Sequence, residues 1–196
     1  MKTIKITVLT LLIGVFAACG DQTNSNDNNE ANEPIISIRK LDIESLEAEI
    51  KKRSAAIEKD TVADKTKSAA LLEAYVVYSD NFPNYNNAAD YTFRAGELAM
   101  NLNHTAHSIK LFSKVYKDYT DYEKRPYALF MKAFVLENQA QNYEEAQKFY
   151  EEFIAEFPDH DMADDAEYSI KNMGKSPEEL IREFERQDSI RAAQAV

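Results

Sequence analysis

The side chains that could do chemistry in this chain of 196 residues are one cysteine, three histidines and several neighbouring carboxylates. His104 and His107 are three residues apart, so both could reach one metal ion from the same side of a helix. Neither has a cysteine, aspartate or glutamate within four residues to complete a ligand set. We therefore interpret both as residues of a turn between paired helices and expect no metal there.

The third histidine, His160, lies in the acidic stretch DHDMADD, residues 159–165, which superficially suggests a calcium loop. An EF-hand loop needs a central glycine and a terminal glutamate at fixed offsets, and this stretch has neither. The same place in two other parts of the chain reads NYNNAAD and DYEKRPY. We expect the acidic residues to cap a helix near its positive end instead of holding a cation.

Three pairs of adjacent glutamates are further candidates for acid–base chemistry: Glu144-Glu145, Glu151-Glu152 and Glu178-Glu179. Adjacent residues of a helix point in different directions, so each pair faces water and not a shared substrate. The chain also has no glycine-rich phosphate loop and no G-x-S-x-G motif. We predict a non-catalytic protein with no cofactor.

The single cysteine, Cys19, follows the features of an export signal. Lys2 and Lys5 precede an uncharged run from Ile6 to Ala18, which ends in two small residues. The run has 13 residues, short of the roughly 18–20 that a lasting transmembrane helix needs. We therefore expect residues 1–18 to be a signal peptide that is removed.

The four residues Phe16-Ala17-Ala18-Cys19 resemble the lipobox of bacterial lipoproteins, with Phe16 where that motif usually has an aliphatic residue. In that family, cleavage falls just before an invariant cysteine, which is then acylated. The resemblance implies that Cys19 carries a membrane anchor, stabilised by about 0.8 kcal/mol for each buried methylene. By resemblance to lipoprotein sorting signals, Gly20 favours the outer membrane, facing the periplasm. The alternative is an ordinary export signal followed by a free thiol.

Residues 20–34, GDQTNSNDNNEANEP, are predicted to form a disordered tether after the lipidated cysteine. They contain no aromatic residue and no aliphatic residue larger than alanine, so nothing in them offsets the entropy cost of ordering. A flexible coil of this length spans about 20 Å. Removal of residues 1–18 takes away two lysines and changes the net charge from −11 to −13. This charge disfavours nucleic acid and anionic lipid surfaces as partners.

Residues 35–196 are predicted to form one all-α domain. Glycine and proline are scarce there, and apolar residues recur at intervals of three and four, as in Leu129, Ala133 and Leu136. We expect eight helices, near residues 42–59, 62–81, 87–102, 105–119, 124–140, 143–157, 162–173 and 177–194.

Three local signals mark where two of these helices begin. Asn142 with Glu145, and Ser176 with Glu179, have the spacing of a capping box. Pro177 stands at the first position of the last helix, where its missing N–H is not needed. The sequence therefore predicts helix starts directly after Asn142 and Ser176.

An internal repeat is the most informative feature of the sequence. The segments FPNYNNAADYTF from residue 82, YTDYEKRPYALF from 119 and FPDHDMADDAEY from 157 align at spacings of 37 and 38 residues. In each copy an aromatic residue precedes Pro or Thr and then Asn or Asp, and a second aromatic lies eleven residues after the first. We expect a helix to end at the first aromatic and a new one to start after the turn. Such a period predicts stacked helical hairpins, each burying its apolar side against a neighbour.

Between about residues 66 and 173 the repeats resemble the tetratricopeptide repeat family. Gly96 and Ala133 match the small position of the first helix in each unit, whereas Lys171 replaces it in the last unit. In the segment NYEEAQKFYEEFIAEFP, the family's small, aromatic, large and proline positions are matched by Ala146, Tyr150, Phe153 and Pro158. The resemblance implies antiparallel helical hairpins stacked in a short right-handed superhelix.

In tetratricopeptide arrays the first helix of each unit lines a concave groove, and this resemblance supplies the candidates for partner binding. They are Asp90, Phe93, Glu97 and Asn101, then Tyr127, Phe130, Phe134 and Asn138, then Asp165, Tyr168 and Asn172. The aromatic residues could grip an extended or helical peptide, while amides and carboxylates bond its backbone or basic side chains. Alternatively, these aromatics are simply packed, or the helix near 42–59 or 177–194 fills the groove.

These features support three hypotheses. The first is a non-catalytic cell-envelope lipoprotein that acts as an adaptor or scaffold for a protein partner. Its lipobox and repeats are similar to the tetratricopeptide lipoprotein of the outer-membrane β-barrel assembly machinery and to periplasmic Tol-Pal-associated repeat proteins, which implies outer-membrane assembly or envelope maintenance. The second is an envelope polymer-binding protein or hydrolase that uses carboxylates brought together by the helical array. The third is a structural spacer without a partner.

Overall fold

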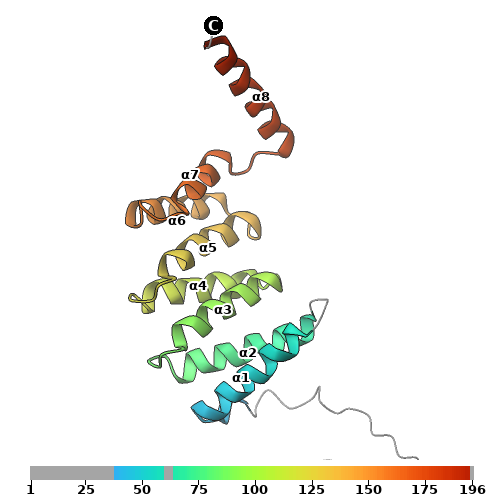
Figure 1. Ribbon diagram of the computed structural model, residues 1–196, viewed down its shortest axis with the longest axis vertical. Coiled ribbons are helices and arrows are strands. Elements are labelled where there is room, and N and C mark those ends of the chain that lie inside the picture. Colours follow the sequence, from blue (N-terminus) through green and yellow to red (C-terminus); the bar gives the residue numbers. More distant parts are fainter. Residues whose placement is uncertain (1–37, 60–63, 195–196) are drawn as a thin grey trace, which may run out of the picture. The chain divides into compact units, whose positions relative to one another are not determined.

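The computed structural model describes residues 38–59 and 64–194. There, a short 3-10 helix, Ile38–Lys40, precedes eight α-helices, which Figure 1 colours in chain order. They are α1 (Ile43–Glu58), α2 (Lys65–Asn81), α3 (Ala88–Asn101), α4 (Thr105–Asp118), α5 (Arg125–Asn138), α6 (Tyr143–Glu156), α7 (Ala163–Asn172) and α8 (Pro177–Gln194). The predicted all-α class is confirmed, and every helix lies within a few residues of its predicted range.

The N-terminal predictions fall on a part of the chain that the structure leaves undescribed. The signal peptide, Cys19 and the tether of residues 20–34 lie outside the described residues, so they remain predictions. Within residues 38–59 and 64–194, no helix is both long enough and apolar enough to cross a membrane.

Each helix from α1 to α6 packs against the next helix along the chain. Buried apolar side chains lie between these neighbours, in one cluster that joins α1 to α4 and two that join α3 to α7. The predicted stack of helical hairpins is therefore confirmed. Leu46 and Ile50 of α1 are buried in the first cluster, with side chains of α2. Helix α1 therefore packs as a member of the stack and does not fill the groove.

The turn between successive hairpins has one geometry in all three copies of the repeat. Helices α2, α4 and α6 each end at an aromatic C-cap residue, Phe82, Tyr119 and Phe157. The residue three positions later donates its backbone N–H to the carbonyl oxygen of that aromatic residue, over 3.1 Å in every copy. A second bond of this kind, over 2.9 Å, follows three residues further on. The turn predicted from the sequence repeat is therefore confirmed in the backbone.

The capping box of Ser176 and Glu179 is formed, whereas at Asn142 the capping bond forms but the backbone N–H of Asn142 donates to the Leu136 carbonyl oxygen instead of the Glu145 carboxylate. The amide oxygen of Asn142 accepts the backbone N–H of Glu145 over 3.3 Å, and the Asn142 amide group donates to the Glu145 carboxylate over 3.0 Å. The hydroxyl of Ser176 accepts the N–H of Glu179 over 3.2 Å, while the Glu179 carboxylate accepts the N–H of Ser176 over 2.8 Å. The bonds to the N–H groups of Glu145 and Glu179 satisfy donors that the first turns of α6 and α8 would leave unpaired.

The start of α7 differs from the prediction that its acidic residues form a cap. Met162 is the N-cap and makes no side-chain capping bond. The imidazole Nδ1 of His160 instead accepts the backbone N–H of Met162 over 3.1 Å. Asp164 and Asp165 lie one step later, in the first turn of the helix. Their negative charges are stabilised by the positive end of the helix dipole, although they make no capping bond.

Close contact between the two helices of a hairpin depends on small residues. A Cβ atom on Gly96 of α3 would lie 2.8 Å from Cε1 of the Phe112 ring in α4. The Ser108 hydroxyl donates to the Gly96 carbonyl oxygen over 2.9 Å. In the next hairpin, Ala133 and Ala146 occupy the corresponding places, and both are fully buried. The small positions inferred from the family resemblance therefore let each pair of helices approach.

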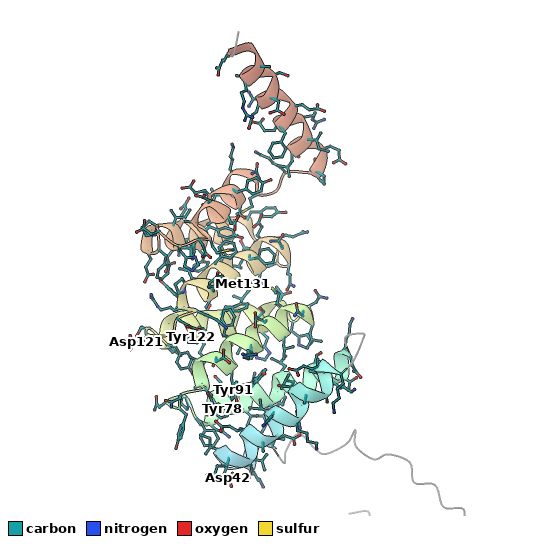
Figure 2. The ribbon with its side chains drawn as sticks, in the orientation of Figure 1. Asp42, Tyr78, Tyr91, Asp121, Tyr122 and Met131 are labelled. Carbon is teal, nitrogen blue, oxygen red and sulfur yellow. The ribbon has the colours of Figure 1, made fainter. Side chains whose placement is uncertain are left out.

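Tyrosine hydroxyls tie neighbouring helices together at the edges of the core. The Tyr78 hydroxyl donates to the Glu47 carboxylate of α1 over 2.7 Å, and its ring meets that of Tyr91, with 4.8 Å between centroids (Figure 2). Burial, together with the neighbouring carboxylate, raises the pKa of Tyr78. The phenol therefore keeps its proton and remains a donor at neutral pH.

Replacement of Gly96 by alanine should destabilise the protein, although alanine favours a helix interior by about 1 kcal/mol. The Phe112 ring that the new methyl group would meet is fully buried, so it can shift only by displacing its own neighbours. We expect a net loss of about 1–3 kcal/mol, as for other overpacked cores, measured by urea unfolding followed by circular dichroism.

The control is the double variant Gly96→Ala with Phe112→Leu. If overpacking is the cause, the alanine should cost much less beside leucine than beside phenylalanine. An equal cost in both backgrounds would contradict the proposed contact.

Candidate functional site

The candidate groove residues all lie on α3, α5 and α7, which are the first helices of successive repeats. Their exposure divides them into three groups. Phe93 and Phe130 are buried, and Asp90, Tyr127 and Asn172 are half-buried. The exposed group is Glu97, Asn101, Phe134, Asn138, Asp165 and Tyr168. The exposed group can meet a partner without any rearrangement of the helices.

Phe93 and Phe130 serve the core and do not line an open groove. Each is only 5% exposed. The Phe93 ring packs against Phe112 of α4, with 5.5 Å between centroids. The Phe130 ring packs against Tyr150 and Phe153 of α6, with centroids 5.3 and 5.6 Å away. For these two residues the alternative of simple packing is correct, because the second helix of each hairpin covers them.

Asp90 is also tied into the fold. Its carboxylate accepts a hydrogen bond from Arg94 on the next turn and another from the Tyr122 hydroxyl over 2.9 Å. The Lys124 ammonium lies 3.8 Å from the same carboxylate and 5.4 Å from the centroid of the Phe93 ring. Asp90 therefore joins α3 to the turn before α5, and its charge is already matched.

Glu97 is the exposed carboxylate of α3 that faces this cluster of charges. No ion pair to Glu97 is formed within the described part of the chain. Partial burial raises the pKa of its carboxyl group, while Lys124 and Arg94 act in the opposite direction. An ionised carboxylate in such surroundings is stabilised by any cation that approaches it. Glu97 is therefore suited to a basic group on a partner.

Helix α5 presents an aromatic ring and an amide side by side. The Phe134 side chain is 37% exposed, and Asn138 follows it by one turn. The Asn138 amide nitrogen donates to the Phe134 carbonyl oxygen over 3.0 Å, which leaves the amide oxygen toward solvent as an acceptor. At the start of the helix, the Tyr127 hydroxyl bonds to Asp161 over 3.3 Å and its ring meets His160. Tyr127 thus supports the turn before α7.

A hollow of about 470 Å³ lies where α5, α6, α7 and the start of α8 meet. Asn138, Tyr168 and Asn172 from the predicted set line it, together with Tyr143, Lys175 and Leu180. Tyr168 is 51% exposed and Tyr143 is 43% exposed. The Lys175 ammonium donates to the Asn172 amide oxygen over 3.2 Å. The hollow therefore combines two aromatic surfaces with amides, a cation and the carboxylates of Glu137 and Glu179.

Sequence reasoning did not identify Tyr143, Lys175 and Leu180 as site residues. Tyr143 is the residue after the capping Asn142 in α6, and a bulky ring at the first position of a helix is a signal that could have identified it. Lys175 and Leu180 belong to the region around the start of α8. Their place in the hollow depends on how the chain turns at Gly174, which has a φ of 75°.

The last helix does not bury its apolar side. No residue of α8 within Pro177–Gln194 is buried. Ile181 is 57% exposed and Phe184 is 51% exposed. Apart from Leu180 and its neighbours at the hollow, α8 therefore does not fill the groove with an apolar face.

Two carboxylates near the candidate helices, Glu137 and Asp161, take part in helix packing. The Glu137 carboxylate accepts the Tyr150 hydroxyl over 2.9 Å, and Asp161 contacts both His160 and Tyr127. Among the described residues, no group of three or more histidines, cysteines and acidic residues is placed to hold a metal ion. These contacts give the carboxylates structural roles.

Comparison with known proteins finds a family for one part of this arrangement. The model of the tetratricopeptide repeat matches residues 127–160, which cover most of α5, all of α6 and the turn after it. No curated protein matches the chain. The chain therefore contains a tetratricopeptide repeat, and the same hairpin packing continues on both sides of it.

The two phenylalanines of α5 should differ in what they contribute to stability. Phe130→Ser removes a buried ring and should cost about 3–5 kcal/mol in the free energy of unfolding. Phe134→Ser changes an exposed position, where about 0.5 kcal/mol is expected. Urea unfolding of both variants measures the difference. Equal losses would contradict the division into a buried and an exposed group.

Proposed function

We propose that this protein is a non-catalytic adaptor that holds a protein partner on the exposed side of its first helices. The tetratricopeptide repeat over residues 127–160 carries this proposal, because its first helix leaves Phe134 and Asn138 exposed. Helical repeats of this type use such extended faces to bind other proteins. We name the exposed residues Glu97, Asn101, Phe134, Asn138 and Tyr168 the first-helix face.

The chemistry of the first-helix face indicates what a partner should offer. Phe134 and Tyr168 provide apolar surface that an aliphatic or aromatic side chain could cover. The amide oxygen of Asn138 can accept a backbone N–H, and the Glu97 carboxylate can pair with a basic group. A peptide segment with spaced apolar and basic side chains, extended or helical, fits these groups.

We further propose that the adaptor is anchored in the cell envelope by lipid on Cys19, at the outer membrane and facing the periplasm. The lipobox-like sequence before Cys19 supports this proposal, as does the export-signal pattern of residues 1–18. A tether of about 20 Å would let the helical part reach a partner close to the membrane surface. A role in outer-membrane assembly or envelope maintenance follows as the most specific form of the proposal.

Affinity purification of the full, tagged protein from its own membranes tests the adaptor function. The double variant Phe134→Ser with Asn138→Ala should lose the partner, because both changes remove exposed side chains of the first-helix face. Both positions are exposed, so the variant should keep its helical content. Circular dichroism of the purified variant checks this, and quantitative mass spectrometry of the bound proteins measures the loss.

The matched control is Tyr85→Ser, which removes an exposed tyrosine, 55% accessible, from the turn between α2 and α3. This variant should retain the partner at the native level. Retention of the partner by the folded double variant would contradict the first-helix face as the binding site. Absence of a specific partner from the native protein would instead favour a structural spacer.

Lipid attachment has a separate test in cells that are fed labelled palmitate. The native chain should incorporate the label and sediment with membranes, and Cys19→Ser should lose both, because the acylated thiol is gone. Phe16→Leu, which restores the usual lipobox residue, should keep the label and serves as the control. A native chain without label, or a labelled Cys19→Ser variant, would contradict the anchor.

A further inference from the structure

On α3 and α5, one side of the helix is covered by the second helix of its hairpin. The corresponding side of α7 is uncovered. Tyr168 lies eleven residues after the turn aromatic, at the position of Phe93 in α3 and Phe130 in α5. Those two rings are 5% exposed because α4 and α6 cover them, whereas Tyr168 is 51% exposed. The next second helix along the chain is α8, and it buries no residue. Each molecule of the protein therefore has an aromatic side chain, Tyr168, that no second helix covers.

Helix α8 carries an aromatic residue at the same distance from its start as the covering aromatic residues of α4 and α6. Phe112 in α4 and Tyr150 in α6 each lie eight residues after the N-cap of their helix. Phe184 lies eight residues after Ser176, whose capping bonds begin α8. Phe184 is 51% exposed, and Ile181 beside it is 57% exposed. Each copy therefore has both the uncovered Tyr168 side chain and a helix with the ring to cover it.

Within one chain, close pairing of α7 and α8 meets a bulky contact. The two preceding hairpins approach through small pairs, Gly96 with Ser108 and Ala133 with Ala146. The corresponding pair in the last unit is Lys171 with Leu180, which are both large. An antiparallel hairpin would place the Lys171 ammonium against the apolar Leu180 side chain. This arrangement loses the close approach that stabilises the other hairpins.

A helix from another molecule is free to run in the opposite sense. Phe184 and Asp188 are one turn apart on the same side of α8, as Tyr168 and Lys171 are on α7. If α8 runs parallel to α7, the Phe184 ring covers Tyr168 and the Asp188 carboxylate lies near Lys171. Among the residues that the structure describes, Asp188 pairs with Arg191 alone, over 3.5 Å, and this solvent-exposed pair contributes little to stability.

We propose that α8 of one copy covers the open face of α7 in a second copy, with Phe184 on Tyr168 and Asp188 near Lys171, so that the protein forms a reciprocal dimer. The two contacts are equivalent, as a two-fold axis requires. This inference goes beyond the adaptor function, although both use Tyr168. Because Tyr168 is covered in the dimer, the residues of the first-helix face that remain for the partner are Glu97, Asn101, Phe134 and Asn138.

Disulfide cross-linking of the full chain tests the exchange of α8. The variants Tyr168→Cys and Phe184→Cys are made separately in a Cys19→Ser background, where no other thiol is present. Mild oxidation of the mixed variants should give a disulfide-linked dimer that contains one copy of each. Tyr168→Cys mixed with Arg186→Cys is the control, because Arg186 is exposed and lies two residues after Phe184, on roughly the opposite side of α8, and it should give none.

A second sample carries Tyr168→Cys and Phe184→Cys in one chain and separates the alternatives. Disulfide-linked dimers support the exchange. An internal disulfide in a monomer would show that α8 folds back on its own α7 and would overturn the proposal. No disulfide in either sample would also overturn it, because another occupant would then cover Tyr168. Purified copies need no partner for this test, so its outcome is independent of the adaptor function.

Discussion

The close approach of two helices at a small residue is the contact on which the rest of this structure depends. Gly96 lets the Phe112 ring lie against the backbone of α3, and Ala133 has the same place in the next hairpin. The Phe112 ring then covers Phe93, and the Tyr150 ring covers Phe130 in the next hairpin. Each pair completes an apolar layer between neighbouring hairpins. Because each hairpin needs its neighbours to bury this layer, the stack is stable only as an array.

The same contact decides which side chains remain for binding. The aromatic residue eleven positions after each turn is buried wherever a second helix closes over it, and one turn later the side chain points to solvent. This is why Phe130 belongs to the core while Phe134 is exposed. At α7 the small residue is replaced by Lys171, and Tyr168 stays open together with the hollow beside it. The residues of the first-helix face are therefore those that the second helix of each hairpin does not cover.

Much of the fold could be predicted because its signals are local and repeated. Periodicity placed the eight helices, and the pairs Asn142 with Glu145 and Ser176 with Glu179 marked two helix starts correctly. Side-chain exposure was harder, because Phe93 and Phe130 share a helix side with residues that face solvent. Only the position of the second helix separates them, and a single sequence does not give the distance between helices. The hydrogen bond from the Met162 N–H to the His160 imidazole was missed for a related reason, since it depends on the exact turn geometry.

The central claim is that a protein partner lies on the first-helix face. Photo-cross-linking in native membranes tests it most directly, with a photoreactive amino acid placed at Phe134 or, for comparison, at the exposed Lys117 of α4. We predict one specific cross-linked protein from position 134 and none from position 117. Cross-linking of that partner only from position 117 would contradict the account, because the binding surface would then lie on the second helices.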